Sequence, residues 1–469
     1  MDGRLKFAIW RFANFLLLTL TLLPSCGGGM QQPPPPPPSQ NFSLVKLSTD
    51  KLTNPDSMHA TELETSAASF HSTIVTSFEI ARKNSHGGGA DIGFAISTDA
   101  GSTWTSRYLS GLTTVRGGSA SATGNASIAY DAKHGVWIIE TLLVHLGLNF
   151  NTLVVVRSSD GMNWGSPITV DATTQADKPW IACDNTVTSS FYGHCYVQWD
   201  TVNIGTLHFS TSTDGGLTWG APVQPSGSLV GGNGQVQVQP NGTVVVPMGT
   251  TSPATFLTGP FTISSVVSTD GGASWNAPVT ISAAPPAHSV FDFRTGASSS
   301  GHDGAGNVYV VWPDCSFRSG CTSNDLVFSK SADGVAWSAP ARIPIDAVTS
   351  TVDHFTPGLA ADSKTSGNTA HLLLTYYSYA QANCTDATCQ LNLGFVTSTD
   401  GGDTWSKAQM LAGPMSLSWI PESDGRDVGD YNSSCYVDGK GFGFFPIAHA
   451  NTGTTLDQAI YTTATPLAQ

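Results

Sequence analysis

STDGGLTW (Ser212–Trp219) decides the fold, because variants of this stretch recur along the chain. Each variant keeps Ser, Asp, Gly and Trp in the same order, and strand-like sequence flanks it on both sides. The other copies are STDAGSTW (Ser97–Trp104), SSDGMNW (Ser158–Trp164), STDGGASW (Ser268–Trp275), SADGVAW (Ser331–Trp337) and STDGGDTW (Ser398–Trp405). Self-similarity of this kind predicts a repeat architecture.

The residue types of the repeat fit a tight turn. An Asp side chain accepts hydrogen bonds from the backbone N–H groups that follow it, and Gly provides the positive φ of a chain reversal. The Trp ring packs its apolar face beneath the turn. We therefore expect each copy to join the third and fourth strands of a four-stranded sheet, which gives a structural role to Asp99, Asp160, Asp214, Asp270, Asp333 and Asp400.

A second repeated element, a strand, a short turn and another strand, precedes each copy. Examples are GQVQVQPNGTVVVPM (Gly234–Met248) and HDGAGNVYVVW (His302–Trp312), and the element occurs seven times. The last occurrence lacks the Asp turn, and FSLVKLST (Phe42–Thr49) can supply its missing outer strand. Pairing the two chain ends would remove an exposed sheet edge. The sequence thus predicts an all-β fold, a single β-propeller of four-stranded blades, seven in number or alternatively six.

These repeats resemble the Asp-box (BNR repeat) sialidase-like superfamily over residues 42–469. The resemblance implies a propeller that acts on glycans, with the Asp turns on the face opposite the active site. An exo-α-sialidase-type glycoside hydrolase is one expectation. A non-catalytic propeller that binds a glycan or a protein is the alternative, because the fold is shared by both. We expect no cofactor and a monomer.

Arginine residues are the first candidates for a binding site on that opposite face. Arg116, Arg294 and Arg426 fall in connections between blades, whereas Arg82 and Arg318 fall in loops between second and third strands. The resemblance implies that three arginines clamp a substrate carboxylate, which the planar guanidinium fork matches. We therefore assign substrate binding to Arg116, Arg294, Arg318 and Arg426. The alternative role for each is a structural ion pair between blades.

The resemblance also implies a Tyr nucleophile assisted by Glu, with an Asp as acid/base. Tyr431 in GRDVGDYN (Gly425–Asn432) is the best-placed Tyr, and Asp430 and Asp177 are the leading acids. Further candidates are Asp427, Asp353, Glu140 and Glu422. The Phe/Tyr-Arg-Ile-Pro motif of catalytic sialidases is missing before the first Asp turn, and the nearest match is Phe293-Arg294-Thr295-Gly296. Tyr431 is accordingly also compatible with a core aromatic.

The N-terminus predicts export. Basic residues precede an apolar run at Phe12–Leu23 that is too short to span a bilayer, and Leu23-Pro24-Ser25-Cys26 resembles a lipobox. We expect residues 1–25 to be a lipoprotein signal peptide and residues 26–41, with the Pro33–Pro38 run, to be an anchor and linker. Residues 42–469 form the propeller. A bacterial cell-envelope lipoprotein, in the outer membrane or at the cell surface, is expected, and secretion is the alternative.

Cysteine and charge usage narrow the function further. The pairs Cys183/Cys195, Cys315/Cys321 and Cys384/Cys389 lie close in sequence and predict local disulfides, which leaves Cys435 unpaired. No pattern of Cys and His has the spacing of a metal site. The net charge of −14 argues against nucleic-acid binding, which needs clustered Lys and Arg. A glycan is the expected partner, and the lipid anchor is the expected membrane contact.

Replacing the proposed lipidation residue tests the anchor. We expect Cys26→Ser to move the protein from the membrane to the soluble fraction, because two or more acyl chains hold a protein firmly to a bilayer. Fractionation followed by immunoblotting measures this. Unchanged membrane association of the variant contradicts the assignment.

Overall fold

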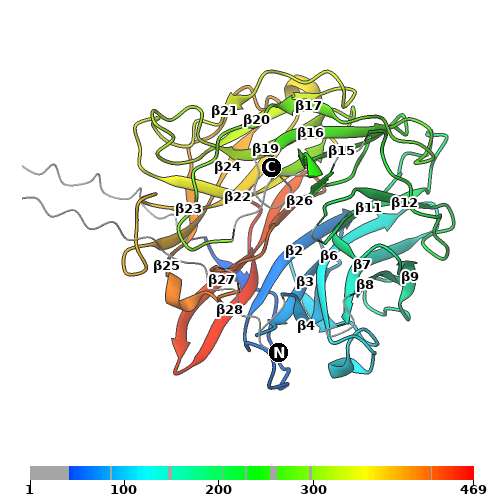
Figure 1. Cartoon of the computed structure of the whole chain (residues 1–469), viewed down its shortest axis with the longest axis horizontal. Helices are drawn as coiled ribbons and strands as arrows, with labels where there is room; N and C mark the ends of the chain where they lie inside the picture. Colours follow the sequence, from blue (N-terminus) through cyan, green and yellow to red (C-terminus); the bar gives the residue numbers. More distant parts are fainter. Residues whose placement is uncertain are drawn as a thin grey trace, which may run out of the picture. The chain divides into compact units, whose positions relative to one another are not determined.

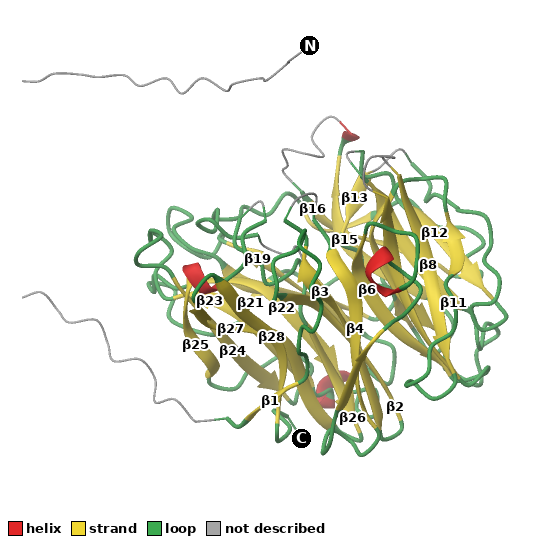
Figure 2. Cartoon of the chain, turned by 90° about the horizontal axis from the view of Figure 1, so that it is seen from below, coloured by secondary structure: helices red, strands yellow, loops and turns green. Residues whose placement is uncertain are grey.

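The computed structural model describes residues 42–84, 87–145, 150–202, 204–227, 230–253, 261–294, 298–423 and 425–468. The predicted signal peptide, Cys26 and the linker lie outside these residues. The described chain is an all-β β-propeller with short 3-10 helices at Thr114–Arg116 (η1), Gly367–Thr369 (η3) and Leu417–Trp419 (η4) (Figure 2). None of its helices has the length and apolar character that crossing a bilayer requires.

Backbone hydrogen bonds join the described strands into six antiparallel sheets. Three of these are four-stranded: β18 (Ser299–His302), β19 (Val308–Asp314), β20 (Asp325–Ser331) and β21 (Ala341–Arg342); β22 (Asp353–Ala361), β23 (Leu372–Tyr379), β24 (Gln390–Ser398) and β25 (Gln409–Ser416); and β26 (Ser433–Val437), β27 (Lys440–Thr452), β28 (Thr455–Thr463) and β1 (Leu44–Lys46).

The other three sheets have eight, three and five strands. The first contains β2 (Glu62–Phe70), β3 (Thr73–Arg82), β4 (Gly89–Ser97), β5 (Thr105–Tyr108), β6 (Ala122–Asp131), β7 (Val136–His145), β8 (Phe150–Ser158) and β9 (Ile168–Asp171). The second contains β10 (Ala176–Cys183), β11 (Cys195–Thr201) and β12 (His208–Ser212). The third contains β13 (Val230–Gly232), β14 (Gln237–Val238), β15 (Val244–Thr251), β16 (Thr262–Ser268) and β17 (Val279–Ser282).

This organisation corrects the predicted blades, because neither seven nor six separate four-stranded sheets form among the described strands. Two successive meanders, β2–β5 and β6–β9, share one sheet through a single pair, Gly89 and Thr123. Gly88 permits this approach, since a Cβ there would lie 2.4 Å from the Thr123 carbonyl oxygen. On the outer side of β12, the second sheet has no fourth named strand among the described residues. An isolated bridge between Phe209 of β12 and Val223 stands at that position.

The strands nearest the axis contact one another in a closed cycle, and we call them the inner strands. Their order is β2, β6, β10, β14, β18, β22, β26 and back to β2. Figure 1 shows the two ends of this series, β26 and β2, side by side. The predicted closure by the chain ends is confirmed, because β1 pairs with β28 from Leu44 with Thr463 to Lys46 with Tyr461.

The repeated turns adopt the expected hydrogen bonding. In the copy at Asp214, Oδ1 accepts the backbone N–H of Thr218 at 3.0 Å, and Oδ2 accepts the Thr218 hydroxyl at 2.6 Å. Each of the six turn aspartates accepts a backbone N–H from three or four residues later. Buried apolar clusters join neighbouring sheets, and in one of them Phe209 stacks on Trp275 with ring centroids 3.8 Å apart.

The structure also contains the three predicted disulfides, Cys183–Cys195, Cys315–Cys321 and Cys384–Cys389. Cys435 is a buried free thiol, and burial raises its pKa to about 12. A buried thiol of this kind behaves as a small apolar residue.

Candidate functional site

The inner strands enclose a channel of about 540 Å³. A small pocket adjoins the channel at the end where these strands begin, opposite the Asp turns, and Trp180 and Gln235 line both cavities. We call it the mouth pocket, and its lining residues are Lys178, Pro179, Trp180, Asn233, Gly234, Gln235, Ser298, Asp430 and Tyr431. Two of the predicted catalytic residues, Tyr431 and Asp430, are among them.

The backbone at this end departs from regular β geometry. In β2, β6, β10 and β22, a register shift interrupts the pairing with the next strand. Each shift contains a non-glycine residue with positive φ: Glu64 (56°) in β2, Asn125 (52°) in β6, Lys178 (46°) in β10 and Thr356 (46°) in β22. A fifth such residue, Asn233 (55°), lies between β13 and β14. Bulges re-aim side chains and are common beside functional sites, and such backbone strain points to a functional role.

Asp430 pairs with two cations at the mouth pocket. Arg294 donates from Nε to Oδ1 and from Nη2 to Oδ2, each at 2.7 Å, and Lys178 Nζ contacts Oδ2. The Asp430 side chain is 8% exposed, whereas those of Lys178 and Arg294 are 15% and 26% exposed. Burial acts to raise the pKa of Asp430, but the charges of Lys178 and Arg294 outweigh it and hold this pKa well below its usual range. The carboxyl group is therefore ionised.

A second, fully buried layer of charge lies behind this pair. Arg82 contacts Glu79 Oε2 at 3.1 Å and Asp427 Oδ2 at 3.0 Å. Asn125 donates its backbone N–H to Glu79 at 2.9 Å and its side-chain amide to Glu64 at 3.3 Å. Burial, reinforced by the Glu64 charge, raises the pKa of Glu79 well above its usual range. The environment of Glu79 accordingly favours its uncharged form.

Tyr431 follows Asp430 in the chain and lies near the carboxyl groups of the second layer. Its ring packs edge-on against Trp180 with centroids 5.3 Å apart, and its hydroxyl donates to the Ala126 carbonyl at 3.4 Å. Only 8% of the residue is exposed. Burial, followed by the negative charges of Glu64 and Glu79, raises the pKa of Tyr431 well above its usual range. The hydroxyl is a neutral donor in the resting protein.

Asp177, the third predicted catalytic residue, lies beside the mouth pocket but does not line it. Its Oδ1 accepts the Lys178 backbone N–H at 2.9 Å, and it faces Asp200 across the β10–β11 pair. Asp200 is buried, and its Oδ1 has no hydrogen-bond partner among the described residues. Burial, reinforced by the Asp177 charge, raises the pKa of Asp200 well above its usual range.

The predicted arginine clamp does not form, because three of its four members lie elsewhere. Of the four, Arg294 alone contacts a residue that lines the mouth pocket, Asp430. Arg116 is exposed, with its guanidinium 5.3 Å from the Tyr108 ring. Arg426 shares a backbone hydrogen bond with Arg294, but its side chain turns to Asp292, at 3.5 Å, and to a backbone carbonyl. A connection between blades spans several residues, so its position alone does not fix the direction of a side chain.

Arg318 belongs to a separate buried ion cluster. It donates from Nε to Asp325 Oδ2 at 2.9 Å and from Nη2 to Asp346 Oδ1 at 2.6 Å, and it also binds the carbonyls of Ala347 and Ser350. This corrects its assignment to substrate binding. The guanidinium instead ties the Cys315–Cys321 loop to the segment after β21.

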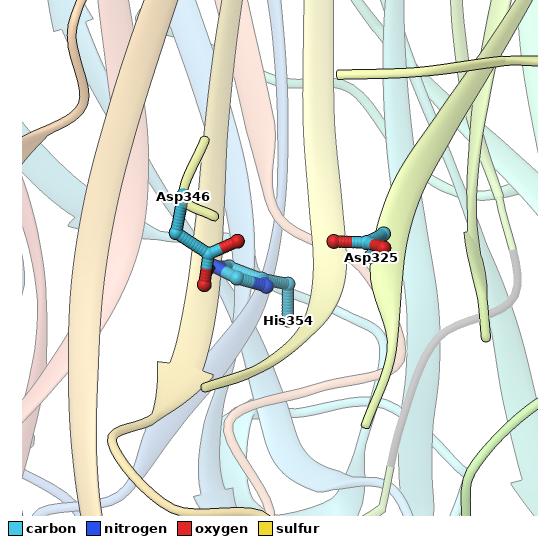
Figure 3. Close-up of side chains that lie close together, drawn as sticks. All are labelled: Asp325, Asp346 and His354. Carbon is cyan, nitrogen blue, oxygen red and sulfur yellow. Dashed lines mark ion pairs between the residues drawn. The ribbon is translucent and has the colours of Figure 1, made fainter. Parts of the chain in front are cut away.

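The same cluster contains one group of side chains with metal-binding atoms among the described residues. Asp325, Asp346 and His354 lie close together (Figure 3), with His354 Nε2 3.9 Å from Asp346 Oδ2. Arg342 joins Arg318 in contacting both aspartates. Two guanidinium groups neutralise the two carboxylates, and a divalent cation here would be repelled. The residues present do not fit a metal centre.

The remaining predicted acids have structural partners. Asp353 is buried and accepts hydrogen bonds from Asn324, and its other oxygen is 2.9 Å from His288 Nδ1. Glu140 is buried and bonds Ser127. The Glu422 side chain is 64% exposed, and its Oε2 lies 3.7 Å from Arg426 Nη1. Asp427 pairs with Arg82, as described above.

Sequence reasoning missed Lys178, Glu64, Glu79 and Asn233. Lys178 stands within DKPW (Asp177–Trp180), next to a residue that was singled out. The residue types at the bulges differ from strand to strand, so the bulges have no recurring sequence motif. The one available signal was the position of Lys178 within DKPW.

Comparisons with known proteins identify the fold. No protein-family model matches the chain, and no curated protein matches it. Among solved structures, an ulvan lyase of polysaccharide lyase family PL25, bound to -[GlcA(1-4)Rha3S]-, is 10% identical, with 90% of this chain and 96% of that chain covered and a TM-score of 0.52. At this identity the likeness shows a shared fold.

Two sialidase structures are also similar. The Hadza microbial sialidase Hz136 is 15% identical, with 85% of this chain and 74% of that chain covered and a TM-score of 0.46. The NanB sialidase from Streptococcus pneumoniae is 13% identical, with 90% and 70% covered and a TM-score of 0.43. The chain is an all-β propeller with these structural neighbours.

Two arginine variants test the corrected assignments. We expect Arg318→Met to lower the free energy of unfolding by about 3–5 kcal/mol, because it leaves buried Asp325 and Asp346 short of a counter-ion. Arg116→Met should cost less than about 1 kcal/mol, since it removes only an exposed contact with Tyr108. Chemical denaturation measures both values. Similar losses in the two variants contradict the structural role of Arg318.

Proposed function

We propose that this protein is an exported β-propeller that acts on glycans at the mouth pocket. The observation that carries the proposal is the gathering of positive-φ residues at one end of the inner strands, beside a pocket lined by charged, amide and aromatic side chains. Backbone strain of this kind persists only when the surrounding structure enforces it, and it clusters at functional sites. The glycan-active proteins named among the structural neighbours support the ligand class.

The composition of the mouth pocket suits a sugar. Trp180 and Tyr431 offer an aromatic surface for the apolar face of a pyranose ring, whereas Asn233 and Ser298 offer hydrogen-bonding groups for hydroxyls.

Glycoside hydrolysis is the reaction proposed for this site. Tyr431 would attack the anomeric carbon while its proton passes to Glu64, which lies near it in the buried layer. Asp177 would give a proton to the departing oxygen. Water would then attack the anomeric carbon and pass a proton to Asp177, while the proton on Glu64 returns to the Tyr431 oxygen as its bond to the sugar breaks. An exo-α-sialidase reaction would further require Lys178 and Arg294 to exchange Asp430 for the substrate carboxylate.

A non-catalytic glycan-binding propeller is the second candidate. It is favoured by the burial of Tyr431 and by the hydrogen bond from its hydroxyl to Ala126, both of which suit a fixed wall of the pocket. Export is common to both candidates, because three disulfides are typical of an oxidising compartment. Anchoring through Cys26 in a bacterial envelope is proposed with them.

Reporter glycosides distinguish the two candidates. We expect the protein to release 4-methylumbelliferone from at least one member of a panel that includes an α-sialoside, and Tyr431→Phe to lower kcat by about 10³-fold or more. Tyr192→Phe is the matched control, because Tyr192 lies in a turn at the opposite end of the sheets.

Each other outcome has a defined meaning. Glycan binding without turnover supports the non-catalytic candidate. Turnover that survives Tyr431→Phe removes the proposed role of Tyr431. The absence of both binding and turnover across neutral and acidic glycans contradicts a glycan function.

A further inference from the structure

We propose that Asp430 is an internal counter-ion that occupies the cation pair Lys178–Arg294, excludes acidic sugars from the mouth pocket and restricts it to neutral glycans. The inference rests on the proposed glycan site and specifies its substrate class. It assigns to Asp430 a role in specificity in place of the predicted role in catalysis.

The contacts of Asp430 are those that an acidic ligand would make. Arg294 donates hydrogen bonds from Nε and Nη2 to the two carboxylate oxygens of Asp430, each at 2.7 Å, and Lys178 Nζ makes a third contact. A substrate carboxylate or sulfate would bind with this same geometry, because a guanidinium fork donates two parallel hydrogen bonds to two oxygens of such an anion. The best anion-binding position in the pocket is therefore already filled by the chain itself.

No other cation near the pocket is free among the described residues. Arg82, 2% exposed, lies in the buried layer between Glu79 and Asp427, and Asp427 also lies 3.8 Å from Arg294 Nη1. Three cations, Arg82, Lys178 and Arg294, thus lie among four carboxyl groups, Glu64, Glu79, Asp427 and Asp430. Each cation already contacts a carboxyl group of the chain, and an entering anion would find no free cation among them.

The groups left to contact a ligand are uncharged. Asn233 and Ser298 line the pocket without belonging to the ion network, and Trp180 supplies an aromatic face. Amide and hydroxyl groups hydrogen-bond sugar hydroxyls in either direction, whereas they give an anion little compensation for lost hydration. The chemistry of these uncharged groups consequently matches a neutral sugar unit rather than an acidic one.

Inorganic sulfate tests the counter-ion role without any sugar. We expect the unmodified protein to show no saturable sulfate binding by isothermal titration calorimetry, and Asp430→Asn to bind sulfate at least about tenfold more tightly, because the variant exposes an unpaired Lys178–Arg294 pair. Raised NaCl should abolish the gain. Asp457→Asn is the control, since it removes the same charge from an exposed pair with Lys46. A folded Asp430→Asn without this gain overturns the role.

A glycan array tests the substrate class on the unmodified protein, so it remains decisive if Asp430→Asn does not fold. We expect the bound glycans to be neutral and their binding to be insensitive to salt. Preferential, salt-sensitive binding of glycans that carry uronic acid, sialic acid or sulfate overturns the inference. If nothing on the array binds, the proposed glycan function fails, whereas the sulfate titration still reports separately on Asp430.

Discussion

At the channel mouth, Glu64, Asn125, Lys178 and Asn233 hold positive φ angles that residues with a Cβ rarely adopt. Each such residue costs of order 1–3 kcal/mol, so the surrounding contacts must enforce it. Glu64 illustrates how. Its carboxylate accepts the Asn125 amide and the Asp430 backbone N–H, and Gly429 packs so close that a Cβ would lie 2.6 Å from the Glu64 backbone N.

The two ends of the propeller therefore differ in how their polar groups are satisfied. At one end, the Asp turns satisfy their own backbone N–H groups through side chains such as Asp214. These turns require nothing from a ligand. At the other end, the bulges direct charged and amide groups into a small space, where ion pairs such as Arg294 with Asp430 compensate buried charge. The first end is thus held by local turn contacts, and the second by contacts between strands distant in sequence.

The sequence predicted the fold well, since repeated turn chemistry reports local geometry. The Asp turns, the pairing of Phe42–Thr49 with the last strand and the three disulfides are all found. The predicted number of separate four-stranded blades, seven or alternatively six, was wrong, because the pairing of Gly89 with Thr123 is a tertiary contact that no local pattern encodes.

The site was predicted only in part, for a different physical reason. Tyr431, Asp430 and Arg294 meet at the mouth pocket, whereas Arg116, Arg318 and Arg426 do not. Loop position indicates which face of the propeller a residue occupies, but the partner of a long charged side chain depends on which carboxylates burial brings near. Lys178 and Glu79 were missed for the same reason, because their importance arises from neighbours distant in sequence.

Hydrogen–deuterium exchange with the tightest-binding glycan tests most directly whether the strained end of the inner strands is the binding site. The account predicts that the ligand slows amide exchange at residues 62–66, 124–127, 176–180 and 230–235, and leaves the Asp turns unchanged. Protection confined to the Asp turns, or to the ion cluster around Arg318, would contradict it.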